Sequence, residues 1–122
     1  MKITNQEIYL IANNLATNFA EINTYIPVKV NFFMQKNIEK ITAAAQDIEK
    51  ARLDIAKHYG ILSEDGQRYE IPDDKTDAVA EEMKNLFSLE QDLDIKTFKI
   101  DDFGAAEFTP PQLSAIMFMI ED

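Results

Sequence analysis

The chain has 122 residues, a net charge of −10 and no cysteine. This length suits one domain with a core of ordinary size, and the absence of cysteine excludes disulfides, thiolate metal sites and thiol nucleophiles. No apolar run approaches the roughly 18 residues of a membrane span, and the opening MKITNQE lacks the apolar stretch of a signal peptide. We therefore expect a soluble intracellular protein.

The charge is distributed unevenly along this single domain, 1–122. Residues 1–62 carry seven Lys or Arg against six Asp or Glu, whereas residues 63–122 carry five against sixteen. The chain thus divides into a near-neutral helical half of net charge +1 and an acidic α/β half of net charge −11. An acidic field repels nucleic-acid backbones, so we expect no direct DNA or RNA binding, while a protein partner with a basic surface is favoured. Acidity that only keeps a small protein soluble is the alternative interpretation.

The first helix is predicted from about Asn5 to about Glu21. Thr4 and Glu7 have the spacing of a capping box, and apolar residues follow at steps of three and four. Pro27 disfavours helical geometry at the residue before it, so we expect a break there.

A second, long helix is predicted over 28–59, since this range contains no glycine or proline and Gly60 suits the C′ position. At 1.5 Å per residue it would be about 45 Å long, which exceeds the core that this chain can build, so part of it would project or pack against another copy. Its apolar positions follow a heptad with one charged interruption: Met34, Ile38, Ile41, Ala45, Ile48, Arg52, Ile55 and Tyr59.

The heptad has two uses that the sequence leaves open. It can form an intramolecular core against the first and last helices, or it can form a seam with a second copy, in which Arg52 would fix the register. Phe32 and Phe33 are consecutive and lie about 100° apart on a helix, so one face cannot bury both. An exposed phenylalanine would be the best partner contact in the chain. The candidate interaction residues of this helix are Phe32, Phe33, Met34, Ile38, Ile41 and Arg52.

The acidic half contains shorter elements. A hairpin over 61–71 is predicted around Asp65-Gly66, followed by a helix with Asp74 as its N-cap. The segment 93–100 is rich in β-formers, and its alternation slips near Thr97, which indicates a bulge or a change of face. A last helix opens at TPPQ, from Thr109. This order predicts an α+β fold that is mainly α, with two N-terminal helices, a small hairpin and strand, and two further helices.

Residues for catalysis are few. His58 is the sole histidine and lies four residues after Asp54, but no nucleophile accompanies the pair, so we expect it to be a surface residue at a helix end. Paired carboxylates can hold Mg²⁺ or transfer protons, yet SEDGQRYE lacks the spacing of a calcium loop and no glycine-rich phosphate loop exists. We predict a non-enzymatic protein without cofactor or metal. The paired carboxylates remain candidate interaction residues: Asp73, Asp74, Glu81, Glu82, Asp101 and Asp102.

Five segments in order carry a family resemblance: MKITNQEIYLIANNL, PVKVNFFMQKNIEKI, DIEKARLDIAKHYG, DGQRYEIP and FTPPQLSAIMFMIED. Together they cover most of the chain, which resembles small uncharacterised proteins of phages and prophages of Gram-positive bacteria, a domain of unknown function. The resemblance implies a phage protein that acts in the cytoplasm of an infected bacterium or in the virion. It implies no active-site residues.

Two functions follow as expectations. The first is a non-enzymatic virion or tail assembly accessory that binds a phage structural protein and can self-associate. The alternative is an acidic inhibitor of a host protein, such as an anti-CRISPR or another counter-defence factor, whose acidic half would mimic DNA in a basic groove.

Overall fold

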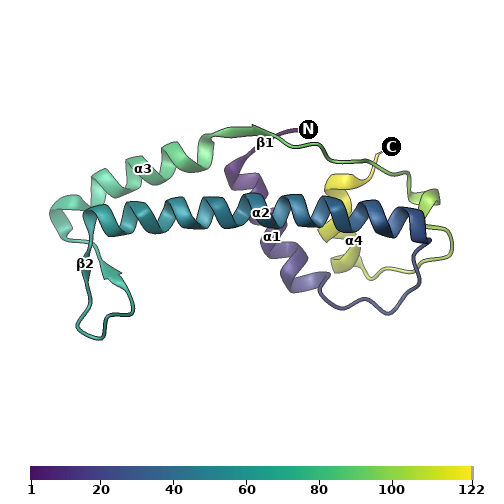
Figure 1. Ribbon diagram of the computed structural model, residues 1–122, viewed down its shortest axis with the longest axis horizontal. Helices are drawn as coiled ribbons and strands as arrows, with labels where there is room; N and C mark the ends of the chain where they lie inside the picture. Colours follow the sequence, from purple (N-terminus) through teal and green to yellow (C-terminus); the bar gives the residue numbers. More distant parts are fainter. Residues whose placement is uncertain (122) are drawn as a thin grey trace.

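The 32-residue helix α2 (Val28–Tyr59) runs almost the full length of the molecule, as the computed structural model of residues 1–121 shows (Figure 1). Helix α1 crosses it near its middle and α3 lies along its C-terminal part (Figure 1), while α4 packs against α1 and shares a core with the N-terminal part of α2. The predicted mainly α, α+β fold with a long second helix is confirmed. The other elements are β1 (Lys2–Thr4), α1 (Asn5–Asn18), β2 (Ile61–Leu62), β3 (Tyr69–Glu70), η1 (Asp73–Lys75), α3 (Thr76–Ser88), β4 (Glu90–Asp92), η2 (Ile100–Phe103), α4 (Pro110–Ile116) and η3 (Met117–Met119).

The predicted start of α1 is confirmed, because the Thr4 hydroxyl accepts a hydrogen bond from the backbone N–H of Glu7. The helix ends at Asn18, before the predicted Glu21. Phe19 leaves the helical conformation and is buried in the core, with its ring 6.0 Å from that of Phe108. The helix therefore ends where Phe19 packs into the core, although the apolar periodicity of the sequence continues beyond this residue.

The predicted bounds of α2 are confirmed, with Pro27 directly before it and Gly60 directly after it. Gly60, however, is the C-cap itself and has an extended backbone (φ −96°) instead of the left-handed one typical of a C′ glycine. A Cβ at this position would lie 2.5 Å from the carbonyl oxygen of Ala56 and 3.0 Å from the Cβ of Tyr69. Glycine is therefore needed here for the close approach of the hairpin to the helix end.

The buried face of α2 is a heptad, but it is rotated slightly from the predicted one. Ile38 and Ala45 are only half-buried, and Asn37 and Ala44 take their places on the buried face. The buried residues are Val30, Met34, Asn37, Ile41, Ala44 and Ile48. The seam thus faces this chain's own core, as in the intramolecular interpretation.

Two groups of buried side chains form the core. The larger lies between α1, the N-terminal part of α2 and the segment 98–119, and the smaller lies between β1, α1 and the middle of α2, where Leu86 and Phe87 of α3 cover it. Ile48 is the last buried residue of α2, and α3 has none. The C-terminal part of α2 therefore projects beyond the core with only α3 and the hairpin beside it (Figure 1).

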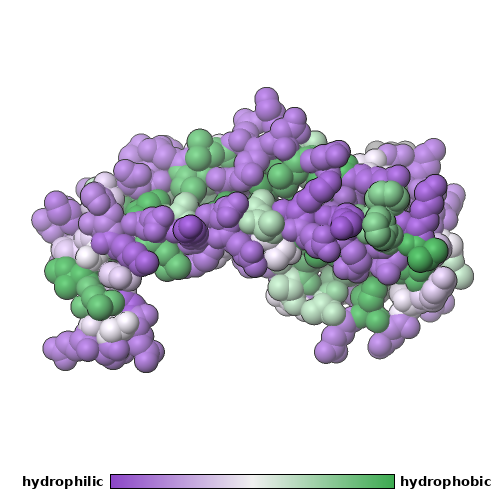
Figure 2. Space-filling view, viewed as in Figure 1, coloured by the Kyte–Doolittle hydropathy of each residue, from purple (hydrophilic) through white to green (hydrophobic). Residues whose placement is uncertain are grey.

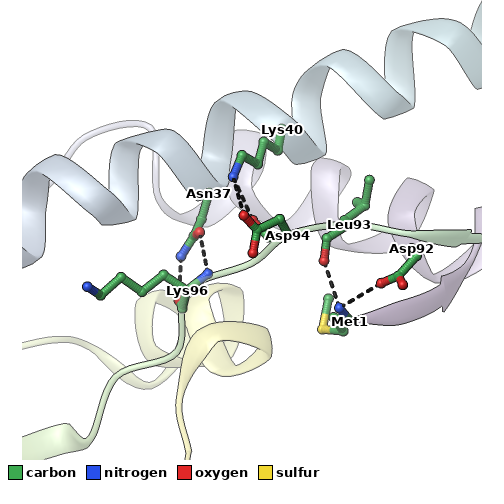
Figure 3. A network of polar contacts seen from close by, with 7 residues as sticks. All are labelled: Met1, Asn37, Lys40, Asp92, Leu93, Asp94 and Lys96. Atoms are coloured by element: carbon green, nitrogen blue, oxygen red, sulfur yellow. Dashed lines mark hydrogen bonds and ion pairs between the residues drawn. The ribbon is translucent and has the colours of Figure 1, made fainter.

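The predicted hairpin is confirmed, since Ile61 pairs with Glu70 and Leu62 with Tyr69 in antiparallel register around Gly66, which has a φ of 72°. The second sheet joins the start of the chain to a segment some 90 residues later, because β1 pairs antiparallel with β4. The N-terminal ammonium donates to the Asp92 carboxylate at 3.0 Å and to the Leu93 carbonyl at 2.7 Å (Figure 3). This pairing was not predicted.

The strand predicted over 93–100 is wrong in position. The ladder is confined to β4, and the following residues run extended along α2 with a different partner at each step. Asn37 donates to the Lys96 carbonyl at 2.8 Å and accepts from the Lys96 N–H at 2.9 Å, and Lys40 donates to the Asp94 carbonyl (Figure 3). Phe98 then pairs with the C-terminal segment at Ile120. The slip in the alternation of apolar and polar residues near Thr97 is thus a change of face. It is not a β-bulge, because residues 93–100 belong to no β-ladder.

The N-cap predicted for α3 is also wrong, because Asp74 lies inside the 3₁₀ turn η1 and Lys75 precedes α3 without a side-chain cap. The cap predicted for α4 is confirmed. Thr109 and Gln112 form a reciprocal capping box in which each side chain accepts from the other's backbone N–H.

Within residues 1–121, no helix is long and apolar enough to cross a membrane.

Candidate interaction surfaces

Three exposed apolar side chains lie where the chain enters α2. Tyr25 is 78% exposed, Val28 is 76% exposed and Phe32 is 56% exposed. Val28 and Phe32 are four residues apart, so they share one face of the helix. Lys29 and Lys36 flank Phe32 on the same helix, with the Lys36 ammonium 5.6 Å from the ring centroid. We call these five residues the lysine-flanked patch.

Phe33 lies about 100° around the helix from Phe32. It is partly buried against the larger core group, and the Lys96 ammonium lies 4.1 Å from its ring centroid. The two rings meet edge to face at 5.3 Å. The expectation that one helix face cannot bury both phenylalanines is confirmed, and Phe32 is the exposed one.

A second exposed apolar surface lies at the other end of α2, on the hairpin. Ile61 is 66% exposed and Leu62 is 51% exposed. They line an open depression of about 590 Å³ together with the acidic residues Glu64, Asp65 and Glu70, and Ser63 and Arg68 complete the lining. The name hairpin patch is used for Ile61, Leu62, Glu64, Asp65 and Glu70. Figure 2 shows hydrophobic surface at both ends of the molecule, over the hairpin and over the start of α2.

The turn of the hairpin is held by its own polar groups. The Ser63 hydroxyl donates to the Asp65 carboxylate, which also accepts the N–H of Gln67 at 3.1 Å. The Ser63 hydrogen bond, followed by that from Gln67, lowers the pKa of Asp65 below its usual value. Arg68 lies 3.4 Å from the Glu70 carboxylate in an exposed pair. The lowered pKa keeps the Asp65 carboxylate of the turn ionised at neutral pH.

The six paired carboxylates do not gather on one face. Asp73, Asp74, Glu81 and Glu82 are exposed on η1 and α3, at the hairpin end of the molecule. Asp101 and Asp102 are exposed on η2 near the start of α2, and Asp102 accepts from the N–H of Lys99. Residues 1–121 contain no group of three or more His, Asp or Glu side chains placed to hold a metal ion.

The remaining candidates on α2 divide between core and groove. Met34 and Ile41 are fully buried, so they are core residues and cannot touch a partner in this conformation. Ile38 is half-buried and lines an open groove of about 560 Å³ between α1 and α2, whose floor includes Leu15 and Phe19.

Arg52, proposed as a register residue between copies, has a partner in its own chain. Its guanidinium donates to both carboxylate oxygens of Glu49, at 2.6 and 3.0 Å, and the Tyr9 hydroxyl of α1 donates to the same carboxylate at 3.1 Å. These contacts, led by the Arg52 hydrogen bonds, lower the pKa of Glu49, and the Glu49 hydrogen bond raises the pKa of Arg52. The ion pair lies within α2, and the Tyr9 hydrogen bond joins it to α1.

His58 is exposed at the end of α2, as the sequence predicts, and its ring packs edge to face on Tyr59 at 4.6 Å.

No family model, curated protein or solved structure matches the chain. Function is therefore inferred from the surfaces themselves.

Sequence reasoning singled out Phe32 but missed its apolar neighbours Tyr25 and Val28, and it missed Ile61 and Leu62. Val28 lies off the heptad seam, which is a usable signal of exposure. The hairpin strands have only two residues each, too short for one face to reach the core. Apolar residues in such strands are therefore candidates for exposure.

Proposed function

We infer that this chain is a non-enzymatic, phage-encoded interaction protein that serves as an accessory in virion or tail assembly. The observation that carries the proposal is the pair of exposed apolar patches at opposite ends of α2. Scattered exposed apolar residues are ordinary on protein surfaces, but a contiguous group with a charged rim is typical of an interaction site. Two such groups at opposite ends of one long helix suit a protein that bridges two partners.

The lining of the α1–α2 groove favours contact over catalysis. Glu49 is the one charged residue of its lining, and both its oxygens are engaged by Arg52 and Tyr9. Its lowered pKa makes it a weak base. The other polar side chains of the lining are Asn13, Gln35, Thr42 and Gln46, which bind by hydrogen bonds and do not titrate near neutral pH.

Affinity purification of the tagged protein from phage-infected cells, followed by mass spectrometry, tests this function. An assembly accessory brings phage structural proteins with it, and the Phe32→Gln variant or the Ile61→Thr/Leu62→Thr variant should lose at least one of them. Leu89→Thr is the matched control, because Leu89 is 58% exposed and lies outside both patches. Equal recovery of the same proteins by all variants would contradict the proposal.

The acidic inhibitor is a second candidate, favoured by one observation. Between Glu64 and Glu82 the chain carries eight Asp or Glu against two Lys or Arg, on the hairpin, η1 and α3. Such an end could occupy a basic nucleic-acid groove of a host protein. Its binding would weaken steeply between low and physiological salt, because exposed charge pairs are screened over about 10 Å at 0.1 M. Recovery of a host factor in a salt-insensitive complex would count against mimicry.

A further inference from the structure

The two patches cannot meet within one molecule. Val28 and Phe32 lie at the start of α2, and the hairpin follows directly after its last residue, Tyr59. A helix of 32 residues separates them by roughly 48 Å at 1.5 Å per residue. The core and the Glu49–Arg52 pair hold this helix as one element, so each patch must be covered by another molecule if it is covered at all.

The charges around the two patches are complementary. Lys29 and Lys36 stand on either side of Phe32, three residues before it and four after it. The hairpin patch carries the carboxylates of Glu64, Asp65 and Glu70, and the one basic residue beside them, Arg68, leaves the lining of the depression with a net negative charge. η2 also brings Asp102 to the start of α2, where it lines a small cavity together with Lys29 and Lys96, so the attraction comes from the lysines and not from the net charge of that end.

The same charges exclude symmetrical pairing of two hairpins. The stretch from Glu64 to Glu82 has a net charge of −6, from eight acidic and two basic residues. Two such ends brought together would repel each other, because like charges across an interface cost free energy. The hairpin patch therefore fits a surface that combines apolar groups with lysines, which is what the start of α2 presents.

We propose that the lysine-flanked patch of one chain docks on the hairpin patch of a second copy, so that the chains join head to tail. Val28 and Phe32 enter the open depression and contact Ile61 and Leu62, while Lys29 and Lys36 face the carboxylates of Glu64 and Glu70. The exposed apolar side chains are then removed from water on both sides.

This contact is heterologous, because a different surface of each molecule takes part. A docked pair still has one free patch of each kind, so assembly continues as an open chain or closes as a ring. Both patches are small, at the low end of known interfaces, so association is weak and requires high local concentration. The inference deepens the proposed function by naming a second copy as the partner.

Sedimentation velocity over a concentration series up to about 1 mM tests the proposal. The wild-type chain should form species beyond the dimer as concentration rises. Phe32→Gln lacks an intact lysine-flanked patch, and Ile61→Thr/Leu62→Thr lacks an intact hairpin patch, so each variant alone should remain a monomer. An equimolar mixture of the two should give dimers and nothing larger, since it offers one intact pair of patches.

The mixing result separates head-to-tail docking from its alternatives. A wild-type monomer at every concentration overturns the proposal, and so does a mixture that stays monomeric while the wild type associates. Association of either variant alone to the wild-type extent also overturns it. Circular dichroism and thermal unfolding check that the variants fold, and Leu89→Thr should associate like the wild type. A monomeric wild type would leave the capture of phage structural proteins unaffected, so this test and that of the proposed function fail separately.

Discussion

Asn37 shows how one side chain can replace a strand neighbour. It lies in a polar stretch of the sequence, yet only 1% of it is exposed. Its amide donates to and accepts from the backbone of Lys96, as a residue of a neighbouring strand would (Figure 3). The amide also approaches the Met119 sulfur, at 3.7 Å. This residue therefore ties the extended segment to α2.

Asn37→Ala should destabilise the fold by about 2–3 kcal/mol. The substitution leaves a cavity, and it removes the hydrogen-bond partners of both the backbone N–H and the backbone carbonyl of Lys96. Urea denaturation followed by circular dichroism measures the change. Asn13→Ala is the control, since Asn13 is exposed on α1, and its effect should stay within about 0.5 kcal/mol. Equal effects of the two substitutions would show that the amide contacts contribute nothing.

The Glu49–Arg52 pair gives a pH-dependent contribution. Because the pKa of Glu49 is lowered in the folded state, the pair stabilises the fold above the ordinary glutamate pKa of about 4.3, and this stabilisation is lost as pH falls through the lowered value. Glu49→Gln should therefore cost at most about 1 kcal/mol at pH 7, since the pair is partly exposed.

The difference between wild type and Glu49→Gln should shrink as the pH falls below the ordinary glutamate pKa, and it should vanish once Glu49 is protonated in the folded state. Urea midpoints collected at several pH values provide the measurement. Glu39→Gln is the matched control, because Glu39 pairs with Lys36 at 3.7 Å in a more exposed i,i+3 pair. A pH-independent cost for Glu49→Gln would assign its role to packing instead of charge.

At the scale of the element, α2 divides into a part with a core behind it and a part without one. Ile48 is 2% exposed in the smaller core group, whereas Ile55, one heptad later on the same face, is only half-buried. Ile48→Ala should cost about 2–4 kcal/mol and Ile55→Ala about 1 kcal/mol, because the cavity left by the second can be reached by solvent. Urea denaturation of the two variants tests this order. A larger cost for Ile55→Ala would show that the distal helix carries the fold.

Periodicity and capping located the helices because both signals are local. The cap at Thr109, the break at Pro27 and the span of α2 need only neighbours in sequence. The segment 93–100 shows where this fails, since its β-forming residues have no second strand and bond instead to Asn37, Met119 and Glu121. The β1–β4 pair is likewise invisible from sequence, because its two short strands are polar on one face and some 90 residues apart.

At the scale of the whole molecule, α2 should act as a rigid spacer. Because the chain contains no cysteine, pairs of introduced cysteines can carry spin labels specifically. Labels at exposed positions 29 and 57 should give one narrow distance distribution near 42 Å, and labels at 29 and 46 one near 26 Å. Double electron–electron resonance at low protein concentration measures both.

The pair at 29 and 46 serves as the control, because it spans the part of α2 that the core supports. A narrow distribution for this pair with a broad or much shorter one for 29 and 57 would mean that the distal helix frays or bends. The two patches would then be able to approach within one chain, which would remove the reason for a second copy.

The sequence by itself determined the helices, the caps at Thr4 and Thr109, the hairpin turn, the uneven charge and the rule that Phe32 and Phe33 cannot share a face. These follow from steric preferences and spacing within a few residues. Only the tertiary structure decided that Asn37 belongs to the core, that Arg52 pairs with Glu49, and that Phe32 and Ile61 are exposed at opposite ends. Burial depends on which distant segments cover a surface, and no local pattern contains that information.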